Sequence, residues 1–145
     1  MIDLDEYLER LCRIGSDGGP RPLSRKRRDR EILMKSMLSL MDSGREYREP
    51  EINELLSRWM RDVAPAIETD STTLRRLLVD YGELERTRDG ATYRIGFPAR
   101  PVVFELEVED VDVVATTAAY RDHKQREAAA RPQRQIRRKP GSDPG

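Results

Sequence analysis

The sequence has few of the residues on which metal proteins and disulfide-rich secreted proteins depend. Its 145 residues include one cysteine, one histidine, one tryptophan and two phenylalanines. A single cysteine, Cys12, cannot form a disulfide within the chain, and nothing indicates an oxidising compartment. Because His123 is the only other soft ligand, the chain has too few donors for a zinc or thiolate site. We therefore expect no metal and no cofactor.

Long apolar runs are also missing. The chain begins Met-Ile-Asp-Leu-Asp-Glu, without the basic and apolar regions of a signal peptide, and no apolar stretch approaches membrane-spanning length. These absences predict a cytoplasmic protein without membrane contact. The sequence contains no nucleophile paired with a base, no phosphate-binding loop and no metal-ligand set, so it does not predict an enzyme.

Charged residues are abundant and balanced, with 27 basic and 27 acidic side chains. A chain of this length is expected to form one domain with extensions. Zero net charge argues against a wholly basic nucleic-acid-binding protein but leaves room for local patches. Such patches exist, because basic clusters at residues 25–30 and 131–139 flank an acidic run at residues 105–112.

The rest of the chain is organised around a short helix at residues 70–82. Asp70 is a suitable N-cap, and Gly82 can adopt the left-handed conformation that ends a helix. The apolar residues between them repeat at the spacing of one helix face: Leu74, Leu77, Leu78 and Tyr81. The spacing predicts a helix with one buried side and one exposed side.

A β-hairpin is predicted directly after this helix. Residues 84–87 and 92–95 are prone to form strands, and the pair Asp89-Gly90 between them suits a tight turn. A helix followed at once by a hairpin is typical of a winged helix. We therefore predict an α+β, mostly helical fold: a winged helix-turn-helix domain at residues 24–96, with an added N-terminal helix and a C-terminal helix plus a disordered tail.

Three further elements complete the predicted domain. A helix is expected over residues 24–41, with Ser24 as its cap and Gly44 closing it. Tyr47 lies in an extended segment that can add a third strand beside the hairpin, and Pro50 suits the first turn of the next helix. We expect these elements to share one core, formed by Leu33, Leu40, Leu55, Leu56, Trp59, Leu74, Leu77, Leu78 and Tyr81. Within this core, Leu77→Ala should lower the free energy of unfolding by about 2–5 kcal/mol.

Extensions are predicted on both sides of the domain. Residues 1–15 form a helix capped by Asp3, residues 102–131 form a strap or edge strand followed by a helix, and residues 132–145 form a disordered basic tail. The expected apolar side of the C-terminal helix consists of Val111, Val114, Ala115 and Ala118. The apolar stripes of the two terminal helices require cover, either from a second copy in a homodimer or from each other within one chain.

The exposed face of the central helix predicts double-stranded DNA as a partner. Arg75 and Arg76 point about 100° apart, so Arg75 is expected to pair with a carboxylate, of Asp80, Asp42 or the preceding helix. The residues assigned to the major groove are Thr72, Thr73, Arg76 and Val79, and those assigned to phosphates are Arg86, Arg88, Arg94, Lys26 and Arg27. The cluster at residues 25–30 fits a solvated helix face equally well, and a winged helix can instead be a non-catalytic protein-interaction or dimerisation module.

Four segments resemble a bacterial family, domain-of-unknown-function family 2087. They are Ser-Arg-Lys-Arg-Arg-Asp-Arg-Glu-Ile-Leu from Ser24, Tyr-Arg-Glu-Pro-Glu-Ile-Asn from Tyr47, Thr-Leu-Arg-Arg-Leu-Leu-Val-Asp-Tyr-Gly from Thr73, and Gly-Ala-Thr-Tyr from Gly90. This family is similar to winged-helix regulators, and some members resemble fusions behind an ArsR-type DNA-binding domain. The resemblance implies a transcriptional regulator or an accessory module, and no enzymatic activity. Arg48 departs from the family pattern, which often has a threonine there that can cap the next helix.

Overall fold

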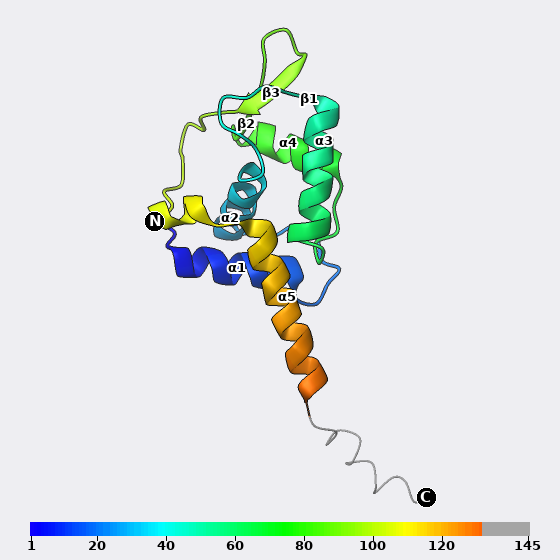
Figure 1. Cartoon of the computed structure of the whole chain (residues 1–145). Helices are drawn as coiled ribbons and strands as arrows, with labels where there is room; N and C mark the ends of the chain where they lie inside the picture. The colour runs from blue at the N-terminus through cyan, green and yellow to red at the C-terminus, as the bar shows by residue number, and fades with distance from the viewer. Residues whose placement is uncertain (132–145) are drawn as a thin grey trace, which may run out of the picture.

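The computed structural model describes residues 1–131 (Figure 1). Its helices are α1 (Leu4–Ser16), α2 (Arg27–Leu38), α3 (Glu49–Arg58), α4 (Ser71–Asp80) and α5 (Val113–Ala130). Its strands are β1 (Tyr47–Arg48), β2 (Leu84–Arg86) and β3 (Thr92–Ile95). A π-helical turn, Trp59–Val63, continues α3, and a 3-10 turn, Leu106–Asp110, precedes α5. The fold is α+β and mostly helical, as the sequence predicts.

The elements between residues 24 and 96 follow the expected order of helix, strand, helix, helix and hairpin. The strands form one antiparallel sheet in the order β1-β3-β2, so Tyr47 does add a third strand beside the hairpin. Helix α3 packs against α4, and α1 packs against both α2 and α5. The hairpin projects from one end of the molecule and α5 from the other (Figure 1). None of the helices within residues 1–131 has the length and apolar content needed to cross a membrane.

Local hydrogen bonds explain where the helices begin. The Asp3 carboxylate accepts from the Glu6 N–H at 2.8 Å, as predicted, and Asp112 caps α5 by accepting from the Ala115 N–H at 3.0 Å. Arg48 provides no side-chain cap for α3, and the Glu51 carboxylate instead reaches back to accept from the Arg48 N–H at 2.9 Å.

The predicted ends of the second helix are wrong. The Ser24 hydroxyl accepts from the Lys26 N–H at 3.2 Å and so forms a turn before the helix, which begins only at Arg27. The helix ends at Leu38, well before Gly44, and short hydrogen-bonded turns follow it. In the first of these turns the Ser39 hydroxyl donates to the Ser36 carbonyl at 2.7 Å. Helix α2 is therefore shorter at both ends than its apolar spacing suggests.

The core is centred on Trp59, whose side chain is 0% exposed. Its indole N–H donates to the Ser36 hydroxyl at 2.8 Å, and that hydroxyl donates to the Leu33 carbonyl at 2.6 Å. Most of the expected core is confirmed: Leu33, Leu56, Trp59, Leu74 and Leu78 are buried, and Leu40, Leu55 and Leu77 are partly buried. The sequence-based interpretation of Trp59 as a core residue is correct.

Tyr81 was expected in the core and is instead 43% exposed. Helix α4 ends at Asp80, so the backbone at Tyr81 has left the helix and no longer continues its buried face. The Tyr81 ring lies beneath the guanidinium of Arg30, 4.1 Å from the ring centroid. A cation–π contact on the surface therefore takes the place of core packing.

The N-terminal stripe is covered within the chain. Tyr7 and Leu11 are buried in the common core, and Ile2 pairs with the strap through hydrogen bonds of 2.9 Å to Val103 and Glu105. Only Phe104 of the strap forms a β-bridge, with Ile2, so this segment is an extended strap and not an edge strand. The homodimer stays a prediction, but one of the two apolar stripes that motivated it, that of α1, is already covered by the rest of the chain.

The predicted apolar face of the C-terminal helix is only partly confirmed, because Val111 and Val114 are partly buried against the core. Val113 and Thr117 are buried, whereas Ala115 and Ala118 are exposed. The reason is polar: the Thr117 hydroxyl and the Arg121 guanidinium both donate to the Asp62 carbonyl, at 3.2 Å and 2.7 Å. These bonds turn the other side of α5 toward α1 and the π-helical turn. The predicted disordered tail, residues 132–145, lies outside the described residues.

Two neighbouring leucines of α4 test the core assignment. Leu78 is 0% exposed, so Leu78→Ala should cost about 2–5 kcal/mol of unfolding free energy through lost burial and a cavity. Leu77 is only partly buried, and Leu77→Ala should cost less than the sequence-based expectation. Urea unfolding of both variants measures the difference. Equal losses for the two variants would contradict the burial assigned to this helix.

Candidate nucleic-acid interface

One face of α4 holds the helix to the protein, and the opposite face is open to solvent. Leu74 and Leu78 are buried. All four residues that the sequence assigns to the major groove are exposed on α4: Thr72, Thr73, Arg76 and Val79. Val79 is 38% exposed. The exposed face thus combines hydroxyl, guanidinium and methyl groups.

Both ends of α4 are closed by interactions that the sequence predicts. The Asp70 carboxylate accepts from the Thr73 N–H at 2.7 Å, and this backbone hydrogen bond is the main reason that the pKa of Asp70 lies below its usual range. At the other end, Gly82 has φ +76°, and the Glu83 N–H donates to the Leu78 carbonyl at 2.8 Å. The helix is therefore short and its bounds are well defined.

Arg75 fixes α4 against α3. Its guanidinium donates to the Asn53 side chain and lies 3.7 Å from the Glu49 carboxylate, and its side chain is 14% exposed. The expected pairing with a carboxylate of the preceding helix is confirmed. Arg76, the next residue, is exposed. Adjacent arginines thus have different surroundings, one within the fold and one at the surface.

The hairpin that follows α4 is closed by the predicted Asp-Gly turn. The Asp89 carboxylate accepts from the Ala91 N–H at 3.0 Å and from the Thr87 hydroxyl at 2.7 Å, and Gly90 has φ +74°. The Ala91 bond is the main cause that lowers the pKa of Asp89. The tip of the hairpin is thereby tied together by side-chain hydrogen bonds.

The three hairpin arginines are exposed but differ in their contacts. Arg94 pairs with Glu85 on the neighbouring strand, at 3.0 Å. Arg86 donates to the Gly90 carbonyl at 3.2 Å. Arg88 makes no hydrogen bond or ion pair with any residue in the described part of the chain, 1–131. Of the three, Arg88 can therefore bind a ligand without first breaking a hydrogen bond or ion pair.

The basic cluster at residues 25–30 does not form a single surface. Lys26 and Arg27 are exposed at the start of α2, and Arg27 lines a small cavity with Ile2 of the N-terminus. Arg28 instead pairs with Glu6 of α1. The sequence-based interpretation also missed buried Asp29, which lies in the middle of the cluster; its only sequence signal is an acidic residue among five basic ones.

Asp29 is buried because it joins α2 to α1. Its carboxylate lies 2.6 Å from the guanidinium of Arg10 and accepts from the Ser24 hydroxyl at 3.2 Å. A half-buried ion pair with a second hydrogen bond needs both partners, because removing one leaves the other charge uncompensated. This part of the cluster is therefore structural.

The overall charge of the candidate interface is neutral. Residues 70–95 contain five arginines and five acidic residues. Arg75 and Arg94 are neutralised by partners, which leaves Arg76 and Arg88 as the cations with the fewest contacts in this surface. Within residues 1–131 there is also no group of three or more His, Cys, Asp or Glu side chains placed to hold a metal ion.

Comparison with known proteins gives one match. The model of a family described as an uncharacterized protein conserved in bacteria (DUF2087) matches residues 21–95, which extend from just before α2 to the end of β3. No curated protein and no solved structure matches the chain. The matched segment includes α4 and the whole hairpin, and it excludes α1, the strap and α5.

The cap of α4 gives a pH-dependent prediction. Because the folded-state pKa of Asp70 is lowered, its contribution to stability is present above the ordinary aspartate pKa of about 3.9 and is lost as the pH falls through the folded-state value. Asp70→Asn keeps a capping oxygen that does not titrate. We expect the melting temperature of the wild type to decrease relative to that of Asp70→Asn as the pH is lowered below about 4. A constant difference from pH 3 to pH 7 would contradict this role.

Proposed function

The chain belongs to this bacterial family, DUF2087, and we propose that it is a winged-helix transcriptional regulator that binds double-stranded DNA through α4 and the β2–β3 hairpin. One observation carries the proposal. Helix α4 is anchored by buried Leu74 and Leu78, presents exposed Thr72 and Arg76 on another face, and continues directly into a hairpin with exposed arginines.

Each exposed residue has a defined role in this proposal. The major groove of DNA is wide enough for a helix, and an arginine can donate two hydrogen bonds to one guanine. Arg76 takes that role, and the methyl groups of Thr72 and Val79 contact thymine methyls. Arg88, at the hairpin tip, contacts phosphate, which contributes affinity and orientation but no sequence preference.

The alternative is a non-catalytic protein-interaction module, and the charge balance favours it. DNA affinity depends strongly on phosphate neutralisation, yet residues 70–95 are neutral overall. Exposed Val79 and Tyr81 would suit an apolar partner surface on a protein. Both proposals use the same face of α4, so a DNA-binding measurement distinguishes them.

The first test removes the proposed base contact. After genomic fragments retained at low salt have been sequenced, Arg76→Ala should weaken binding to the preferred fragment by about 1–3 kcal/mol and reduce its advantage over other fragments. Arg13→Ala, at an exposed arginine of α1, is the matched control and should leave the affinity unchanged. Fluorescence anisotropy gives both affinities. If the wild type retains no fragment at low salt, the interaction-module proposal replaces this one.

The second test removes the proposed phosphate contact. Arg88→Ala should weaken binding to all sequences alike and reduce the slope of log affinity against log salt by about one. Arg88→Lys keeps the charge and should keep the slope. A sequence-dependent loss in Arg88→Ala would assign Arg88 to base recognition instead. An unchanged slope would remove the hairpin tip from the interface.

A further inference from the structure

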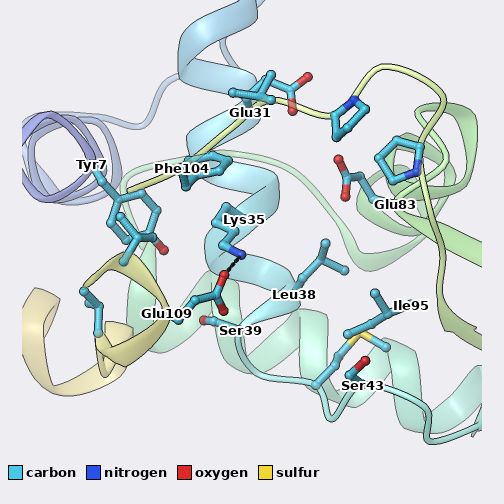
Figure 2. Close-up of a pocket in the computed structure, with 16 residues that line it drawn as sticks. Tyr7, Glu31, Lys35, Leu38, Ser39, Ser43, Glu83, Ile95, Phe104 and Glu109 are labelled. Atoms are coloured by element: carbon cyan, nitrogen blue, oxygen red, sulfur yellow. Dashed lines mark hydrogen bonds and ion pairs between the residues drawn. The ribbon is translucent and has the colours of Figure 1, made fainter. Parts of the chain in front are cut away.

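A cavity of about 490 Å³ lies between α2, the base of the hairpin and the strap at residues 97–111 (Figure 2). This volume is in the range of small-molecule sites in proteins. Its apolar lining includes Leu38 from α2, Ile95 from β3 and Phe104 from the strap. Three segments that are distant in the sequence therefore enclose one space, which lies partly outside the segment that matches the family.

The charged groups that line the cavity are unevenly paired. Lys35 forms an ion pair with Glu109, and its ammonium lies 5.5 Å from the centroid of the Phe104 ring. Glu31 and Glu83 also line the cavity, and neither carboxylate has a hydrogen bond or ion pair with another side chain in residues 1–131. Within residues 1–131, the one cation of the lining already pairs with Glu109, whereas Glu31 and Glu83 have no ion-pair partner.

The two unpaired carboxylates lie on the same side of the cavity (Figure 2). Burial raises the pKa of Glu83, the negative charge of Glu31 raises it further, and the positive charge of Lys35 acts in the opposite direction. Two like charges that approach each other in a partly dry site repel, so a cation placed between them would be stabilised by both.

We propose that this cavity binds an organic ammonium ion with an apolar body. The ammonium group lies between Glu31 and Glu83, and the apolar body packs against Phe104, Leu38 and Ile95. An anion would meet three carboxylates and one neutralised lysine. A bare metal ion would find only two nearby carboxylates and an apolar wall, which is too few oxygen ligands for calcium or magnesium.

Three probes of similar size separate charge from shape. Calorimetric titration of the full chain at neutral pH compares 2-phenylethylamine, 2-phenylethanol and 3-phenylpropionate, which carry a positive, a neutral and a negative group on the same ring. We expect saturable binding of the amine. The alcohol should bind at least about tenfold more weakly, because hydrogen bonds between charged groups are stronger than those of a neutral hydroxyl, and the carboxylate should bind more weakly still.

Single carboxylate variants locate the site. Glu83→Gln and Glu31→Gln should each weaken amine binding at least about tenfold while leaving the affinity for the alcohol unchanged. Glu107→Gln is the matched control, because Glu107 lies on the same strap, is exposed and does not line the cavity. Its affinity for the amine should equal that of the wild type. Near-UV circular dichroism verifies that each variant is folded. If one of the two carboxylate variants does not fold, the other still tests the site.

Several results would overturn the proposal. The site is not as described if the wild type shows no saturable binding of the amine, if the alcohol binds as tightly, or if the carboxylate binds more tightly. The same holds if Glu107→Gln weakens binding as much as Glu83→Gln. None of these measurements involves DNA, so the outcome is independent of the function proposed for α4.

Discussion

The hydrogen bond between the Trp59 indole and the Ser36 hydroxyl is the contact on which the arrangement of the helices depends. Trp59 is the largest fully buried side chain, and its polar N–H would be costly to bury without a partner. Ser36 lies in the last turn of α2, so this bond ties the end of α2 to the π-helical turn that continues α3. Helix α5 in turn packs against the π-helical turn.

The position of α4 follows from that of α3. Arg75 joins the two helices through Asn53 and Glu49, and buried Leu74 and Leu78 complete the contact. Once α4 is fixed, Gly82 turns the chain into the hairpin, and a side chain at that position would crowd the backbone of Pro98, since its Cβ would lie 3.2 Å from the Pro98 Cα. The exposed face of α4 and the hairpin are therefore held on one rigid framework.

The strap encloses the proposed ligand site. It returns from the hairpin to pair with Ile2 and crosses α2 on the way, and the space beneath it is the cavity lined by Glu31 and Glu83. Glu83 comes directly after Gly82, and Ile95 ends β3, so the cavity wall and the base of the hairpin share residues. The proposed DNA surface and the proposed ligand site therefore both adjoin the base of the hairpin.

Much of the fold could be predicted from the sequence because it depends on neighbouring residues. The Asp3 and Asp70 caps, the turn at Gly82 and the Asp-Gly hairpin tip each involve groups within a few positions of one another. The buried pair of α4 and the core position of Trp59 follow from apolar spacing alone, as does the separation of Arg75 from Arg76.

Other features were decided by contacts between segments that are distant in the sequence. The periodicity of apolar residues cannot predict such contacts. The buried face of α5 is set by bonds from Thr117 and Arg121 to other parts of the chain, and not by its alanines. Tyr81 leaves the core for Arg30 because its helix has already ended. The sequence by itself determined the helix caps, the turns and the polar face of α4, through local hydrogen bonds and spacing. Only the tertiary structure decided which arginines are paired and where the cavity lies, because charge pairing and enclosed space require segments that only folding brings together.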